Sequence, residues 1–149
     1  TTLVAVCSLL ASAGWNTRGV SEHYFSEAPS GDFTPREIEV ERRLMDGLRS
    51  IDGIRLLGDA STGSRTADVQ RIAIASFDVE GVHAHDAGQF LDARGIAIRV
   101  GHHCAQPLHR RFGLSATVRA SASVFTSDAD IDILLDAVSG IRTYFGADR

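Results

Sequence analysis

The strand-and-loop stretch GIAIRVGHHC, from Gly95 to Cys104, organises the pattern of the whole chain. Gly95 is predicted to end a preceding helix, because glycine adopts the left-handed conformation at helix ends without a steric penalty. Ile96, Ile98 and Val100 then point to one side of a strand. This strand leads directly into a loop that presents a single thiol, so we expect the loop to be a reaction centre.

The loop places potential cations beside its thiol. Cys104 follows Arg99, His102 and His103. A thiol is a nucleophile only as the thiolate, which a nearby Arg or protonated His favours. We also expect either histidine to move protons near neutral pH. Buried cysteines are usually inert, so the thiol and the histidines by themselves leave catalysis open.

Local signals divide the rest of the chain into alternating helices and strands. Thr34, Pro35 and Glu37 mark a helix start as cap, first residue and capping-box partner. Ser127 and Asp130 mark another start in the same way. The first expected helix covers residues 35–53, with Gly53 as the stop, and its apolar face consists of Ile38, Leu44, Met45, Leu48 and Ile51. Further helices are expected at 84–94, 107–112 and 127–146. The expected strands cover 54–57, 71–77, 96–100 and 118–125.

The order of these elements predicts one α/β domain, with a small sheet covered by helices. Connections around the Cys104 loop are short enough for antiparallel neighbours, so we expect a mixed or mainly antiparallel sheet. The domain is predicted to cover residues 34–149, with an irregular loop at 58–68. Residues 1–33 are predicted to form a connection, helical over 1–14 and irregular over 15–32.

Composition excludes several classes of function. The chain has 149 residues, of which 44% are hydrophobic and 23% charged, as in a soluble globular protein. Its net charge of −4 gives no electrostatic reason to expect nucleic acid or an anionic membrane as a partner. No apolar stretch reaches the ~18 to 20 residues that span a bilayer. Residues 1–13 lack the basic start of a signal peptide, and we expect a helix from a longer chain there.

The cysteine and lysine contents are informative. Cys7 and Cys104 suggest no disulfide framework, which fits a reducing cytoplasm, although a bridge between them stays open. All fifteen basic residues are Arg. Pyridoxal phosphate is normally linked to a lysine amine, so this chain alone cannot build that linkage.

Two motifs carry a family resemblance. The loop Arg99-Val100-Gly101-His102-His103-Cys104, followed by Arg119-Ala120-Ser121, closely resembles the C-terminal part of pyridoxal-phosphate-dependent cysteine desulfurases of the SufS type, which include selenocysteine lyases. These are class V aminotransferases of fold type I. The resemblance extends best over residues 82–132, more weakly over 36–58, and poorly before 36. It implies the small C-terminal domain of such an enzyme.

The resemblance also implies roles for these residues. Cys104 would be the catalytic nucleophile that takes sulfur from L-cysteine, or selenium from selenocysteine, as a persulfide-type adduct while alanine leaves. Arg119 would bind the substrate carboxylate, and Arg99, His102 and His103 would support the loop, which is expected to be mobile. Where the family commonly has Tyr-Asn-Thr, this chain has Phe125-Thr126-Ser127, so any contact made by that Asn is lost.

The wider setting is likewise implied by the resemblance. Such enzymes are cytoplasmic homodimers that pass sulfur to an acceptor protein of the SufE or SufU type for iron–sulfur cluster assembly. Their pyridoxal 5'-phosphate would be anchored by a lysine of a large domain outside these 149 residues.

Two alternatives remain beside this interpretation. The chain is either part of the enzyme or a non-catalytic fragment or module that binds a sulfur-transfer partner through the loop. A zinc site is the chemical rival, since the chain offers soft and borderline ligands. Three of them are adjacent and cannot easily all face one ion, so we expect no metal; the ligands considered are His83, His85, His102, His103, Cys104 and His109.

Overall fold

The computed structural model describes residues 35–58 and 72–148. The predicted helix at 1–14, the irregular segment at 15–32, the cap Thr34 and nearly all of the loop at 58–68 lie outside these residues. The described elements follow the order α3 (Pro35–Arg49), β1 (Ile54–Leu57), β2 (Ile74–Val79), α4 (Ala84–Asp92), β3 (Arg99–Gly101), α5 (Gln106–Phe112), β4 (Thr117–Ser121), α6 (Asp128–Ser139) and α7 (Ile141–Phe145).

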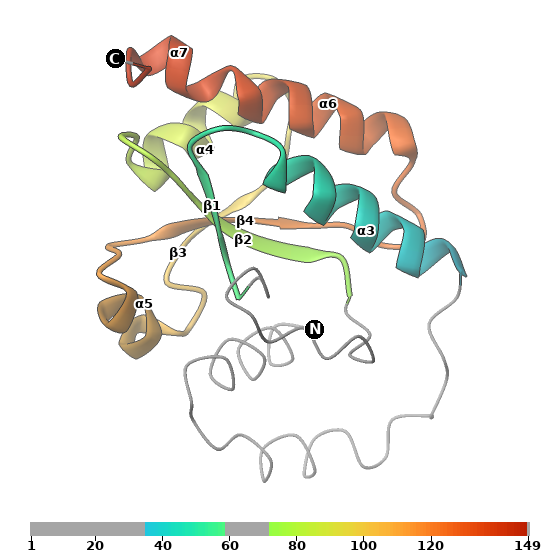
Figure 1. Cartoon of the computed structure of the whole chain (residues 1–149), viewed down its shortest axis with the longest axis horizontal. Coiled ribbons are helices and arrows are strands. Elements are labelled where there is room, and N and C mark those ends of the chain that lie inside the picture. Colours follow the sequence, from blue (N-terminus) through green and yellow to red (C-terminus); the bar gives the residue numbers. More distant parts are fainter. Residues whose placement is uncertain (1–34, 59–71, 149) are drawn as a thin grey trace, which may run out of the picture.

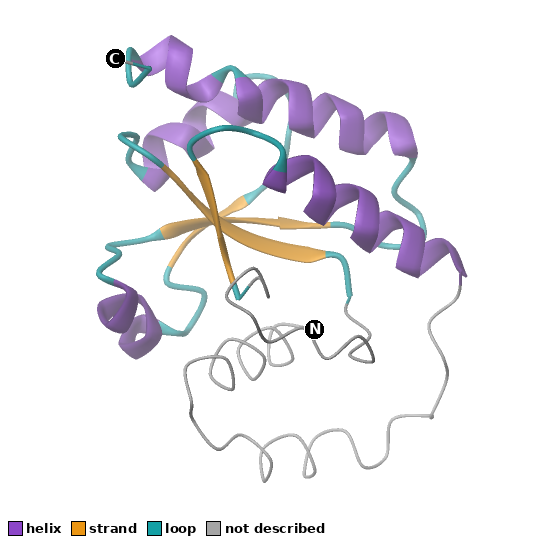
Figure 2. Ribbon diagram, viewed as in Figure 1, coloured by secondary structure: helices purple, strands orange, loops and turns teal. Residues whose placement is uncertain are grey.

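The four described strands form one antiparallel sheet in the order β1-β2-β4-β3 (Figure 2). This confirms the expected α/β class and the mainly antiparallel sheet. β3 pairs with β4, although helix α5 lies between them in the chain. The pairing places the start of the Cys104 loop against the start of β4.

Helices α3, α4 and α6 lie together on one face of the sheet (Figure 1). Their buried side chains meet those of the central strands, where alternate residues such as Phe77 and Val118 point toward the helices. α5 lies outside this layer, at the end of the sheet where β3 leaves and β4 begins (Figure 1). The residues of β4 that alternate with Val118, namely Thr117 and Arg119, therefore face the side away from the helical layer.

The helix starts were predicted well and the helix stops less well. α3 begins at Pro35 but ends at Arg49, before the turn that contains Gly53. Its buried stripe consists of Val40, Leu44, Met45 and Leu48, whereas Ile38 is 45% exposed. The expected face was wrong at Ile38 because Val40, Leu44 and Leu48 follow each other at a spacing of four residues, which aligns them on one side of a helix.

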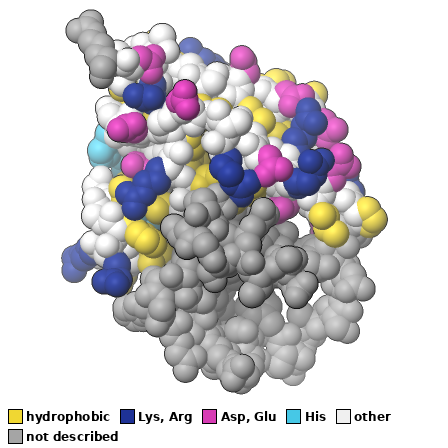
Figure 3. Space-filling model, viewed as in Figure 1, with side chains coloured by type: hydrophobic (Ala, Val, Ile, Leu, Met, Phe, Trp, Pro, Cys, Tyr) yellow, Lys and Arg dark blue, Asp and Glu magenta, His cyan; other side chains and the backbone are white. Residues whose placement is uncertain are grey.

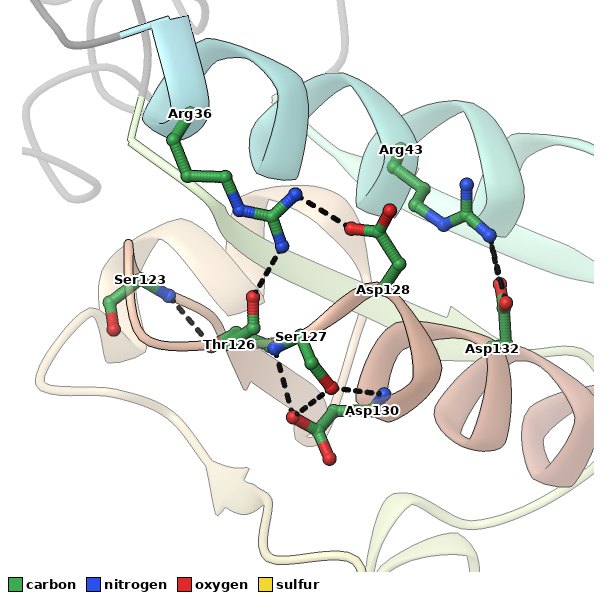
Figure 4. A network of polar contacts seen from close by, with 8 residues as sticks. All are labelled: Arg36, Arg43, Ser123, Thr126, Ser127, Asp128, Asp130 and Asp132. Carbon is green, nitrogen blue, oxygen red and sulfur yellow. Dashed lines mark hydrogen bonds and ion pairs between the residues drawn. The ribbon is translucent and has the colours of Figure 1, made fainter.

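The last predicted helix is two helices. Ser127 and Asp130 form the expected capping box, in which each side chain hydrogen-bonds the other residue's backbone N–H (Figure 4). Gly140 ends α6, and α7 follows as a short helix. α6 is joined to α3 by ion pairs of 2.7 Å from Arg36 to Asp128 and from Arg43 to Asp132 (Figure 4).

Three predicted strands have different bounds in the structure. β2 begins at Ile74 rather than at residue 71 and ends two residues later than expected. β4 ends at Ser121, since Ser123 and Thr126 close a turn in which the Ser123 N–H donates to Thr126 Oγ1 at 3.0 Å. β3 is limited to Arg99–Gly101. Residues 96–98 diverge from β4, and a cavity of about 350 Å³ is lined by both segments. Within the described part of the chain, no helix combines the length and apolarity needed to cross a membrane.

Candidate active site

The Cys104 loop connects the end of β3 to the start of α5. Gly101, the last residue of β3, has φ 129°, a conformation that side chains rarely adopt, and this allows the chain to leave the sheet. His103 and Cys104 then follow with φ 51° and 63°. Two successive non-glycine residues in the left-handed region cost roughly 1 to 2 kcal/mol each, so surrounding contacts must hold them there.

Cys104 presents a free, exposed thiol. Its two chain neighbours, His103 and Ala105, are buried. The loop therefore exposes the sulfur while its flanking residues are fixed in the protein. The expected mobility of the loop stays a prediction, and the flanking residues show where the loop is attached to the rest of the domain.

His103 is held as a neutral ring. Its Nε2 lies 3.2 Å from the carbonyl oxygen of Thr117, and a carbonyl only accepts, so Nε2 carries the proton. Burial, and then the charge of Arg119, lower the pKa of His103 from 6.5 to about 4. A pKa of about 4 leaves the ring of His103 uncharged near neutral pH, where its hydrogen bond to the Thr117 carbonyl favours an anchoring role.

His109, which the sequence offered only as a possible metal ligand, and Thr117, which the sequence did not indicate, both contact the Cys104 loop. His109 is buried, with Nδ1 3.0 Å from the Ala105 carbonyl oxygen and Nε2 3.0 Å from Thr117 Oγ1. Thr117 is fully buried. The four-residue spacing of Ala105 and His109 is the only local signal, and it says nothing of Thr117.

Arg119 and Arg99 face each other across the β3–β4 pair. Burial, and then the charge of Arg99, lower the pKa of Arg119, while Cys104 acts in the opposite direction. Arg119 Nε is buried and has no hydrogen-bond partner among the described residues. Over residues 35–58 and 72–148 neither guanidinium forms an ion pair. Like charges opposite each other destabilise a sheet, so this arrangement suits an anion that binds both.

The remaining predicted residues are placed as follows. His102 is exposed, and its ring packs edge-on against His109 at 5.4 Å between centroids. His83 and His85 stack at the start of α4, where His83 Nδ1 accepts from the His85 N–H. In the described ranges no three His, Cys, Asp or Glu side chains are grouped so that they could hold a metal ion.

The segment Phe125-Thr126-Ser127, which stands where the family commonly has Tyr-Asn-Thr, makes mainly local contacts. Ser127 caps α6 and Thr126 Oγ1 closes the preceding turn, so both hydroxyls have structural partners. Phe125 is 92% exposed. The structure therefore explains the polar residues of this segment but gives no contact for the aromatic ring.

Comparisons with known proteins show the family of the chain. Residues 13–134 match the model of the aminotransferase class-V family. The chain is 47% identical over 110 residues to the probable cysteine desulfurase 2 of Mycobacterium leprae, covering 74% of this chain and 25% of that protein. A probable cysteine desulfurase of Streptomyces coelicolor is 40% identical over 99 residues, which cover 66% of this chain and 22% of that protein.

Solved structures give the same result. The apo cysteine desulfurase of Thermococcus onnurineus matches with a TM-score of 0.62 and 29% identity, over 73% of this chain and 26% of that one. The cysteine desulfurase CsdA of Escherichia coli matches with a TM-score of 0.60 and 27% identity, over 82% of this chain and 28% of that one. The chain thus spans about a quarter of the length of the relatives it matches. From the family model, the relatives and the shared fold together, it follows that the chain belongs to the aminotransferase class-V family.

Proposed function

We propose that this chain is the small C-terminal domain, residues 34–149, of a pyridoxal-phosphate-dependent cysteine desulfurase, preceded by a connecting segment at 1–33. Cys104 takes the substrate sulfur, and Arg119 holds the substrate carboxylate. The observation that carries the proposal is the β3–β4 pairing, which sets Arg99 and Arg119 opposite each other, neither with an ion-pair partner among the described residues, while Arg119 interacts with the exposed Cys104. The similarity to proteins named as cysteine desulfurases supports it.

The positive charge that interacts with the proposed nucleophile belongs to a residue of the sheet. Cys104 interacts electrostatically with Arg119, whereas the neighbouring His103 is uncharged near neutral pH. Arginine keeps its charge at every physiological pH. The role of attracting an anionic substrate to Cys104 is therefore assigned to Arg119, with Arg99 opposite it, rather than to the adjacent histidine.

The arginine pair suits a carboxylate. A planar guanidinium donates two parallel hydrogen bonds to a carboxylate, and Arg119 has a buried Nε–H without a partner in the described part of the molecule. Binding a carboxylate there would satisfy that donor and relieve the repulsion between the two arginines. We assign the carboxylate to Arg119 and a supporting role to Arg99.

The cofactor is not anchored by this chain. The family implies pyridoxal phosphate in the full-length enzyme, but these 149 residues contain no lysine to which it could be linked. The described residues fit the substrate carboxylate and not the covalent anchor. We therefore propose that the lysine belongs to a large domain outside this sequence.

The type of desulfurase and its substrate are inferred from the sequence motif and not from the fold. Arg99-Val100-Gly101-His102-His103-Cys104 supports a SufS-type enzyme that acts on L-cysteine or selenocysteine. We further propose a homodimer in the cytoplasm that passes its sulfur to an acceptor of the SufE or SufU type for iron–sulfur cluster assembly.

A chimera tests the proposal directly. Residues 35–149 replace the matching quarter of the Mycobacterium leprae relative, and the product is assayed for alanine formed from L-cysteine and for a persulfide on Cys104. We expect both products from the parent chimera and neither from Cys104→Ser. Arg119→Lys should raise KM for cysteine by at least about tenfold, because a charge-assisted bidentate contact is lost.

The control is Arg42→Lys, an exposed arginine on α3 away from the loop. It should leave KM unchanged. A folded chimera that forms no alanine, or one in which Cys104→Ser retains full turnover, would refute the assignment. The 149-residue chain alone, given pyridoxal phosphate and cysteine, should show no turnover; turnover there would refute the claim that the anchor lies elsewhere.

A further inference from the structure

One buried threonine is linked to the residues on both sides of the thiol, directly to His103 and through His109 to Ala105. His103, immediately before Cys104, reaches the Thr117 carbonyl oxygen through Nε2 at 3.2 Å. Ala105, immediately after Cys104, is bonded by His109 Nδ1 at 3.0 Å, and the other nitrogen of His109 lies 3.0 Å from Thr117 Oγ1. The loop, α5 and β4 are thereby joined at a single point.

The hydrogen-bond chemistry fixes the direction of each contact. The Ala105 carbonyl only accepts, so His109 Nδ1–H is the donor. In the neutral ring Nε2 then has a lone pair, and the Thr117 hydroxyl donates to it. His103 has the opposite tautomer, with its proton on Nε2. Each imidazole therefore has the one tautomer that its carbonyl partner permits.

We infer that Thr117 and His109 are positioning residues, which fix the backbone at Cys104 relative to Arg119. Thr117 precedes Arg119 by two positions on β4, so the two side chains share one face of the sheet. A rigid link from Thr117 to the loop therefore sets the separation between the thiol and the guanidinium. The link itself rests on the hydrogen bonds, and only its purpose, to place the thiol beside the substrate-binding arginine, rests on the proposed function.

The backbone of the loop explains why such a link is needed. His103 and Cys104 both have left-handed φ angles, which a free loop of these residues would not retain. Simple packing would not depend on a hydroxyl, because valine has the shape of threonine. The hydroxyl is the one group of Thr117 that reaches His109. Removing it separates the positioning role from the packing role.

The first test measures the rings in the unaltered chain. Nitrogen chemical shifts in an NMR spectrum identify the protonated nitrogen of each imidazole. We expect Nε2–H for His103 and Nδ1–H for His109 at neutral pH. The other tautomer at either ring would overturn the link.

The second test measures how positive the surroundings of the Cys104 sulfur are. Iodoacetate and iodoacetamide react with the same thiolate, so the ratio of their rates cancels the thiolate fraction and reports the local potential. The tryptic peptide Val100–Arg110 contains Cys104 and not Cys7, so mass spectrometry reads this thiol alone. We expect the ratio to be about threefold above that of a free cysteine peptide, since the charge of Arg119, which interacts with Cys104, attracts the anionic reagent.

Variants then locate the link. Thr117→Val and His109→Phe should each lower the ratio toward that of the free peptide. The double variant should lower it no further than His109→Phe does, because that substitution already removes the contact that Thr117→Val removes. Thr117→Ser keeps the hydroxyl and should retain the ratio. Arg119→Met is the positive control and should lower it.

Thermal unfolding is recorded for each variant so that only folded samples are compared. An unchanged ratio in whichever of Thr117→Val and His109→Phe folds, or an additive fall in the double variant, would overturn the proposal. Should neither fold, the tautomers of the unaltered chain decide. None of these readouts uses the cofactor or cysteine turnover, so failure of the proposed function would leave them unaffected.

Discussion

Burial changes what a histidine contributes beside a reactive thiol. An exposed imidazole titrates near neutral pH, whereas His103 is desolvated, faces Arg119 and donates to a carbonyl. Its ring is therefore suited to holding a conformation. The positive charge that interacts with Cys104 comes from Arg119 on the sheet.

The depressed pKa of His103 predicts a pH dependence of stability. In the unfolded chain the ring has a pKa near 6.5, and in the folded chain about 4. Between these values the unfolded chain binds more protons, so stability is complete above pH 6.5 and falls as the pH drops toward 4. We expect a loss of about 2 kcal/mol over this window, allowing for solvent near the loop.

Urea unfolding at a series of pH values measures this loss, and His103→Asn should flatten the curve between pH 6.5 and 4. His102→Asn, at the exposed neighbour, should not. A curve for the parent chain that is flat in this window would contradict the burial of a neutral His103. The carboxyls of Asp128 and Asp130 have lowered pKa values, so their contribution is lost only at more acidic pH.

At the scale of residues, the sequence predicts the candidate nucleophile and the candidate carboxylate-binding arginine, but it does not predict the residues that position them. Cys104 and Arg119 belong to short motifs that are visible in the chain. His109 and Thr117 meet only because β4 returns beside β3, and their contact depends on that pairing. No local pattern encodes it.

At the scale of the elements, two helix glycines differ in how closely other atoms approach them. Gly88 lies buried in α4, where an added Cβ would come within 2.6 Å of Val100 Cγ2 in β3. Gly140 separates α6 from α7 with right-handed φ and ψ, and the nearest atom to an added Cβ is 3.6 Å away. The same substitution should therefore have opposite effects at the two sites.

We predict that Gly88→Ala lowers the free energy of unfolding by about 1 to 3 kcal/mol, because the methyl group pushes α4 away from β3. Gly140→Ala should raise it by up to about 1 kcal/mol, since alanine restricts the unfolded chain and fits the native backbone. Urea unfolding of both variants measures the difference. Equal effects would show that the α4–β3 contact is looser than described.

Element ends differ in how far the sequence predicts them. The start of α6 was predicted correctly because a capping box is complete within four residues. The start of β3 was not, because residues 96–98 have strand-like alternation but diverge from β4 beside the cavity. Strand length depends on a partner, and helix starts depend on neighbours in the chain.

For the whole molecule, the helical layer is held to the sheet by apolar burial rather than by its ion pairs. Leu44 is fully buried in the core shared by α3, α6 and the sheet. Arg43, which comes directly before Leu44 on α3, forms an exposed ion pair with Asp132. On the face shown in Figure 3, acidic and basic side chains are interspersed over the helices, as expected for solvated pairs of small individual effect.

We predict that Leu44→Ala lowers the free energy of unfolding by about 3 kcal/mol, because it leaves a cavity in the core. Arg43→Ala should give no measurable change, since both partners are solvated and the pair is screened by salt. Chemical denaturation of the two variants in low and physiological salt makes the comparison. A larger loss from Arg43→Ala than from Leu44→Ala would show that the ion pairs hold the layer.

The left-handed backbone at Cys104 has a consequence for how this position would evolve. Glycine and asparagine accept a φ of 63° more readily than cysteine does. A library selected only for folding would therefore enrich glycine or asparagine at position 104, whereas a library selected for sulfur transfer would keep cysteine. Disagreement between the two selections at this one codon would mark the thiol as retained against the preference of its own backbone.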